Sequence, residues 1–185
     1  MASPLAAEHG PAERIGALQH FSTSLYGAMP PPPDRVALSR YDPVGPGCWR
    51  VGITLKDGLR SLTVDAGYWP ARETPAPLVV GLSFLGPAGV LPSPVFPIDP
   101  HMVMDTDPAL GLVEGAPAEH MRGAHMARWP LSLFYDAGVS LLLAGYGSFV
   151  PDCPRRWQSA GLWPLLHGGT DPGDEATRPG AITLW

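Results

Sequence analysis

The spacing of hydrophobic residues changes at a run of four prolines, Pro30–Pro33. Before the run, four apolar residues recur at the spacing of one helix face: Ile15, Leu18, Phe21 and Leu25. Pro11 suits the first turn of a helix, whose N–H groups have no partner within the helix. The pattern predicts a disordered N-terminus over 1–10, a helix over 11–29 and a stiff polyproline spacer over 30–34.

Beyond the spacer, apolar residues alternate with smaller or polar ones, which is the period of a strand with one buried face. Two such runs, Val51–Leu55 and Leu62–Ala66, flank the pair Asp57-Gly58. Asp-Gly favours a tight hairpin because both residues tolerate positive φ. The segment Pro77–Gly86 is predicted to be a third strand.

The second half of the chain shows weaker patterns. Leu131–Phe149 alternates on both sides of an Asp-Ala-Gly sequence, which favours a second hairpin over a helix. Ala118–Trp129 is predicted to be a short helix or an irregular loop, and Ala181–Trp185 a final strand. The expected fold class is α+β, with the N-terminal helix packed on a mainly antiparallel, hairpin-built sheet. Residues 35–185 are expected to form one domain with long Pro/Gly-rich loops.

Composition supports a loop-rich globular chain of 185 residues with 24 Pro and 22 Gly. Only 16% of residues are charged, against about 25% in an average soluble domain. The net charge is −5 and no basic run occurs, which disfavours nucleic-acid binding. An aspartate and several glycines interrupt the longest apolar stretch, which disfavours a membrane span. Two widely spaced cysteines, Cys48 and Cys153, and no recognisable signal peptide lead us to expect a cytoplasmic protein.

Three of the six histidines are directly followed by methionine: His101, His120 and His125. Adjacent side chains diverge in a strand and do not stack in a helix, so the His-Met pairs themselves make poor ligand sets and copper is less favoured. In an extended segment, His101 and Asp105 share one face. With His120 or His125 they would form a mixed N/O site for Zn, Fe or Mn. The alternative is that the methionines fill gaps in the core.

A serine hydrolase is disfavoured by the motifs. The sequence HGGT at His167 looks like an oxyanion loop, but no G-x-S-x-G sequence supplies a nucleophile. The segments GLSFLG (81–86) and GYGSF (145–149) both miss that pattern.

Tryptophans and arginines in Pro-flanked loops have the composition of interface hot spots, although the rings could equally close the core. The candidate partner-binding residues are Trp69, Arg72, Trp129, Arg155, Arg156, Trp157, Trp163 and Trp185. We therefore predict a non-catalytic accessory subunit that docks on a larger protein, such as an enzyme, and helps to hold a peptide at a sheet edge. The alternatives are a metal-binding protein or metal-dependent enzyme and, third, a small-molecule-binding domain.

Overall fold

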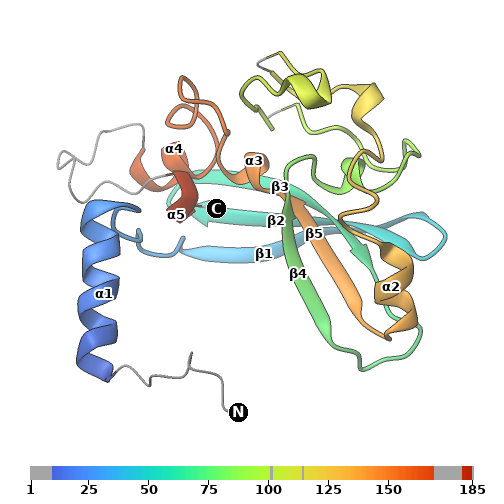
Figure 1. Ribbon diagram of the computed structural model, residues 1–185, viewed down its shortest axis with the longest axis horizontal. Coiled ribbons are helices and arrows are strands. Elements are labelled where there is room, and N and C mark those ends of the chain that lie inside the picture. Colours follow the sequence, from blue (N-terminus) through green and yellow to red (C-terminus); the bar gives the residue numbers. More distant parts are fainter. Residues whose placement is uncertain (1–9, 101, 114, 169–180, 185) are drawn as a thin grey trace, which may run out of the picture.

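The computed structural model describes residues 10–100, 102–113, 115–168 and 181–184. It confirms the α+β fold, with an N-terminal helix and a mostly antiparallel five-stranded sheet (Figure 1). The strands are β1 (Arg35–Gly45), β2 (Cys48–Asp57), β3 (Arg60–Trp69), β4 (Leu78–Ser83) and β5 (Ser140–Gly145). The α-helices are α1 (Pro11–Ser24), α2 (Leu131–Asp136), α3 (Tyr146–Phe149), α4 (Leu162–His167) and α5 (Ala181–Leu184). Three short 3-10 helices, η1 (Pro87–Gly89), η2 (Pro108–Leu110) and η3 (Glu119–Met121), lie in the loops.

The first three strands form an antiparallel meander, and the strand order is β1-β2-β3-β5-β4. The predicted Asp57-Gly58 hairpin is confirmed, since Asp57 pairs with Arg60 across the turn. Gly58 has φ 55°, and its N–H donates to the Asp34 carboxylate at 2.8 Å. β1 was not predicted, because charged residues interrupt its apolar alternation.

The predicted hairpin over Leu131–Phe149 is half wrong. Its first part is the helix α2, which Gly138 ends with φ 67°, a backbone conformation that favours glycine. Its second part is the strand β5, which lies between β3 (antiparallel) and β4 (parallel). The predicted strand at Ala181–Trp185 is also wrong: residues 181–184 form α5, where Leu184 is buried in the core. Four residues with apolar character fit one helical turn as well as a strand.

The core lies on both faces of β5, because successive side chains of a strand point to opposite faces. Ala144 belongs to a cluster with residues of β2, β3 and α4, whose buried members include Val64 and Trp163. Leu141 and Leu143 belong to a second cluster, formed with Trp69, Val90 and Phe96. The centre of the sheet is therefore covered on both sides.

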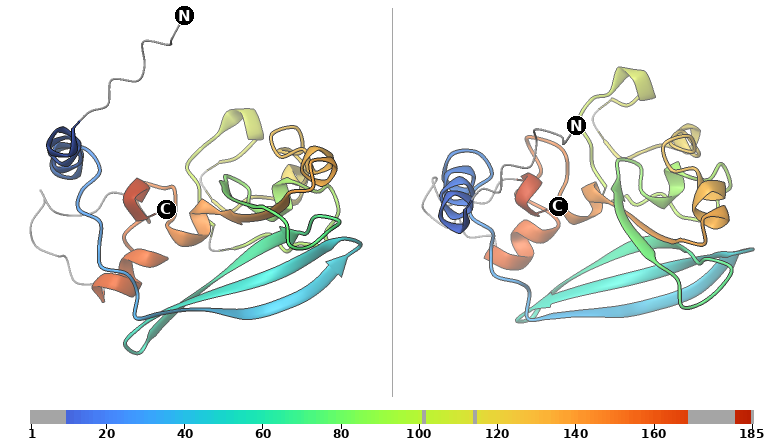
Figure 2. Two further views of the ribbon diagram at one scale, coloured as in Figure 1. Left: turned by 90° about the horizontal axis from the view of Figure 1, so that it is seen from below. Right: turned by 60° about the horizontal axis from the view of Figure 1, so that its bottom comes forward.

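Helix α1 stands at one end of the molecule, away from the central strands (Figure 2). Its predicted apolar residues Ile15, Leu18 and Phe21 are all exposed. The Thr183 hydroxyl of α5 donates to the Tyr26 carbonyl, which links α5 to the segment after α1. No helix within the described residues is long and apolar enough to cross a membrane.

Candidate active site

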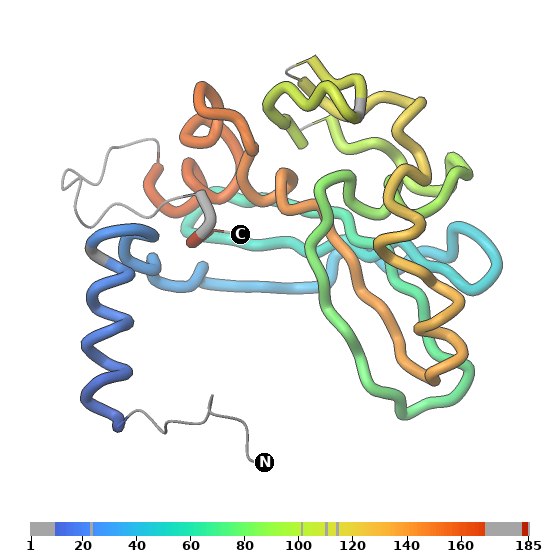
Figure 3. Tube along the Cα trace, viewed as in Figure 1, coloured from blue at the N-terminus to red at the C-terminus, as the bar shows by residue number. Residues whose placement is uncertain are grey.

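The two parallel strands, β4 and β5, have their carboxyl ends next to each other at the same end of the sheet. Ser83 is the last residue of β4, and it lies opposite Gly145, the last residue of β5. The loops of residues 85–100, 102–113 and 115–130 gather above these ends (Figure 3). In open sheets with parallel strands, ligands bind outside the carboxyl ends of the strands. The carboxyl ends of β4 and β5 are therefore the expected place for a ligand-binding site.

The loop that carries His125 holds this residue against the carboxyl end of β4. The backbone N–H of His125 donates to the Gly89 carbonyl at 2.8 Å, and the backbone N–H of Gly123 donates to the Ala88 carbonyl at 3.2 Å. These bonds place the His125 Nδ1 atom 3.5 Å from the Ser83 Oγ atom, at the limit of a hydrogen bond. The loop thus brings an imidazole to a hydroxyl 42 residues away in sequence.

The environment of His125 keeps its imidazole neutral at neutral pH. Burial lowers the pKa of His125 below its usual value, and the positive charge of Arg128 lowers it further. The negative charge of Asp107 acts in the opposite direction but is the smallest of the three effects. A neutral imidazole can accept a proton, as a general base must.

Tyr146 provides a hydrogen-bond donor at the end of β5. Its hydroxyl donates to the Asp152 carboxylate at 2.8 Å. Burial, this hydrogen bond and the charges of Asp152 and Asp107 all raise the pKa of Tyr146, so the phenol stays protonated. The Phe84 ring packs edge-on against Tyr146, with ring centroids 4.7 Å apart, and also faces His125 at 6.4 Å. Phe84 therefore connects the two polar side chains.

Asp107 is fixed by its own backbone. It exchanges two hydrogen bonds with Leu112, at 3.0 and 2.9 Å, and its Oδ1 atom accepts from the Ala109 N–H at 3.0 Å. Its charge acts on both His125 and Tyr146. The carboxyl ends of β4 and β5 thus bring together a neutral imidazole and nearby carboxylates, and the imidazole is the group that can act as a general base. The Tyr146 hydroxyl, whose single proton bonds to Asp152, helps to fix this arrangement.

Ser83 is only 3% exposed. Its hydroxyl is therefore largely shielded from solvent, and its position near Nδ1 leads us to assign Ser83 to positioning the His125 ring.

A cavity of about 250 Å³ borders the segment that follows β4. It is lined by Leu85, Gly86 and Pro87, by Ser148 of α3, and by Arg50 and Asp65. Asp65 accepts hydrogen bonds from Arg40 at 2.7 Å and from Arg50, so the floor of the cavity is charged. It gives a polar ligand room next to the carboxyl ends of β4 and β5.

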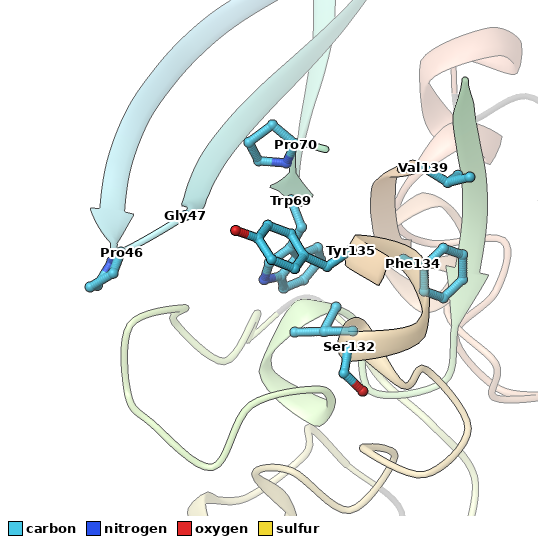
Figure 4. Close-up of a pocket in the computed structure, with 9 residues that line it drawn as sticks. Pro46, Gly47, Trp69, Pro70, Ser132, Phe134, Tyr135 and Val139 are labelled. Atoms are coloured by element: carbon cyan, nitrogen blue, oxygen red, sulfur yellow. The ribbon is translucent and has the colours of Figure 1, made fainter. Parts of the chain in front are cut away.

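A larger pocket, of about 450 Å³, lies at the opposite end of β5 (Figure 4). It opens between the end of β3, which carries Trp69, and α2, which carries Ser132 and Tyr135. Its lining is mostly apolar and contains no histidine, carboxylate or cation. It therefore has no imidazole or carboxylate that could act as a general base beside the hydroxyls of Ser132 and Tyr135, so we do not assign it to catalysis.

The predicted metal ligands are not brought together. His101 lies outside the described residues. Asp105 is exposed and accepts from the Thr106 N–H at 2.7 Å, and His120 is exposed near Gly111. Among the described residues, no group of three or more His, Cys, Asp or Glu side chains is placed to hold a metal ion. Three of the four methionines of this region, Met102, Met104 and Met121, are buried, as the packing alternative predicts, whereas Met126 is 50% exposed.

The predicted partner-binding residues do not form one surface. Trp69 and Trp163 are buried in different core clusters. Trp157 packs edge-on against Trp163 at 4.8 Å, and Trp129 is half-buried beside Gly81. The Arg72 guanidinium lies 4.3 Å from the Tyr135 ring centre, Arg155 and Arg156 are exposed, and Trp185 lies outside the described residues.

Sequence reasoning missed Ser83 and Tyr146 as site residues, because it tested their segments only for a nucleophile motif. A usable signal was present. LVVGL and SLLLAG are nearly continuous apolar runs, which are typical of parallel strands buried on both faces. Pairing these two runs in parallel would have placed their carboxyl ends side by side, and with them Ser83 and Tyr146.

No protein-family model matches the chain, and no curated protein sequence matches it. Solved structures show the class of fold. A glucuronoyl esterase from Solibacter usitatus matches with a TM-score of 0.70 and 24% identity. A promiscuous CE15 esterase from a marine bacterial metagenome matches with a TM-score of 0.66 and 18% identity. A CE15 glucuronoyl esterase from Teredinibacter turnerae matches with a TM-score of 0.56 and 20% identity.

These matches cover 92–93% of this chain but only 38–44% of each esterase chain. The chain therefore has the fold of less than half of an esterase. This likeness contradicts the prediction of a non-catalytic accessory subunit and gives no support to its metal-binding alternative. The prediction went wrong because missing motifs were taken as evidence against catalysis.

Proposed function

We propose that this chain forms the acid–base and binding side of a carboxyl ester hydrolase site, with an ester of an acidic sugar as substrate. The observation that carries the proposal is the likeness to glucuronoyl esterases over 93% of the chain. The neutral imidazole of His125, held beside the carboxyl ends of parallel strands, supports it because this group can accept a proton.

In this proposal His125 moves the proton. As the nucleophile's oxygen bonds to the ester carbonyl carbon, its O–H bond breaks and the proton passes to the imidazole. The imidazolium then returns the proton to the departing alkoxide as the C–O bond breaks. Ser83 lies at Nδ1, so Nε2 is the nitrogen that carries the proton. The sequence holds no G-x-S-x-G serine, and we propose that the nucleophile comes from the part of the esterase fold that this chain does not cover.

The test follows the His125 ring by NMR while the purified chain is titrated with the methyl ester of glucuronic acid. We expect a saturable shift of the His125 ring resonance, assigned by its loss in His125→Gln. The exposed His20 of α1 is the internal control and should not shift. Methyl glucoside, which lacks the ester, is the control ligand. If the His125 ring resonance does not shift at millimolar concentrations of the ester, the proposal is overturned.

The cytoplasmic location belongs to the proposal too. Cys48 and Cys153 are both buried, and no disulfide joins them in the part of the chain that the structure describes, which fits a protein made in a reducing compartment.

A further inference from the structure

The two outer strands of the sheet differ in how they meet solvent. An exposed strand edge is a template for pairing with another chain, and proteins protect such edges with charges, prolines and bulges. β1 has all three: Arg35, Arg40, Asp42 and Pro43 lie along it, and its pairing with β2 shifts register twice. The β1 edge is therefore protected.

β4 has none of these devices. Its sequence, LVVGLS, contains no charge and no proline, and its pairing with β5 is regular. Leu78, Val80 and Leu82 are 50%, 67% and 39% exposed on one face. On the other face Val79 lines an apolar groove of about 380 Å³, together with Trp129 and Leu133. Both faces of β4 thus expose apolar side chains.

The composition of β4 is that of an interior strand. Parallel strands are normally covered on both faces and consist of nearly continuous apolar residues. β5 has such a sequence, SLLLAG, and it is interior and almost wholly buried. β4 has a matching sequence, but among the described residues it has a partner strand on only one side.

We propose that a further apolar β-strand pairs in parallel with the open side of β4, supplied by a polypeptide outside residues 1–185 that completes an esterase-type sheet. This inference rests on the proposed function. The matched esterases supply the argument for the occupant, since more than half of each of their chains is unmatched. A second copy of this chain fits less well, because two β4 strands related by a two-fold axis would pair antiparallel.

The probe is the portion of the Solibacter usitatus esterase that this chain does not match, co-expressed with this chain and carrying an affinity tag. We expect a one-to-one complex. Val80→Lys should lower the yield of complex at least tenfold, because it places a charge on an apolar face of β4 that the completed esterase-type fold would cover. Val36→Lys on the protected edge strand β1, at a site that is 60% exposed, is the matched control and should leave the yield unchanged.

Folding is checked on each variant by far-UV circular dichroism. Val80→Thr, which keeps the β-branched shape without a charge, serves as a second β4 variant and should retain the complex. Absence of a complex, a complex insensitive to Val80→Lys, or self-association of the chain through β4 would each overturn the inference. If the complex depends on β4 but the ester causes no shift of the His125 ring resonance, only the proposed function is contradicted.

Discussion

At the scale of single residues, the chemistry of the candidate site depends on what surrounds His125 and Tyr146. The same burial moves the two pKa values in opposite directions, because it disfavours the charged form of each group. Imidazole loses its proton more easily, and phenol keeps its proton. A base and a donor therefore coexist at neutral pH within one shell of side chains.

The lowered pKa of His125 predicts a pH-dependent stability. An unfolded histidine titrates near about 6.5, whereas the folded His125 takes up its proton only at lower pH. As the pH falls through this window, the unfolded state binds the proton first, so the free energy of unfolding decreases. Urea titrations at a series of pH values between about 7 and 5 should show this decrease in the wild type and a smaller decrease in His125→Gln. Equal slopes for both proteins would show that His125 is not responsible.

Two glycines with positive φ differ in the space that a side chain would find, and this difference predicts the cost of replacing each by alanine. Gly161 has φ 71°, and a Cβ atom there would collide with the Phe149 carbonyl oxygen. Gly47 has φ 67° but open space around it. We expect Gly47→Ala to cost about 1 kcal/mol, from the left-handed conformation alone, and Gly161→Ala clearly more. Thermal unfolding of the two variants measures the difference, and similar melting temperatures would contradict the expectation.

At the scale of elements, cross-strand charges hold the antiparallel part of the sheet in register. Asp65 of β3 accepts from Arg50 of β2 and from Arg40 of β1, so one carboxylate joins three strands. All three side chains are only partly exposed, at 38% or less, which reduces the screening of their charges by water. The network complements the hairpin turn in fixing which residues pair.

Asp65→Asn should therefore destabilise the meander by about 1–2 kcal/mol at low salt, and by less at high salt. The control is Asp57→Asn at the hairpin end, which removes a single ion pair with Arg60 and should cost under about 1 kcal/mol. Urea midpoints at two salt concentrations provide the measurement. A larger loss for Asp57→Asn would show that the network does not act as described.

At the scale of the whole molecule, the sheet joins two hydrophobic clusters through β5. Leu143 is fully buried in the cluster on one face, while its neighbour Ala144 is buried in the cluster on the other. A cavity made at this strand should weaken the whole described domain, because the two clusters share its backbone.

Leu143→Ala should lower the free energy of unfolding by about 2–5 kcal/mol. That is a large part of the total of about 5–15 kcal/mol typical of a domain. The matched control is Leu59→Ala in the β2–β3 turn, where the leucine is fully exposed and truncation should cost less than about 0.5 kcal/mol. A single cooperative transition is expected for both variants. Two separate transitions would show that the clusters unfold independently.

Local patterns predicted the elements that spacing and turn residues mark within a short segment. These elements are the α1 helix, the Asp57-Gly58 hairpin and strand β4, although the partner of β4 lies far away in sequence. The first half of Leu131–Phe149 failed, because short apolar runs fit a helix and a strand equally well until their neighbours are known. The site failed for a related reason: Ser83, His125 and Tyr146 belong to no common motif.

The sequence by itself therefore determined the α+β class, the β2–β3 hairpin and the loop-rich character of this chain, because these depend on local periodicity and turn chemistry. Tertiary structure alone decided that β4 and β5 run parallel and end together. It also decided that His125 lies against Ser83 and that an apolar strand remains at the edge of the sheet. These features depend on contacts between residues far apart in the chain, whose pairing no local pattern specifies.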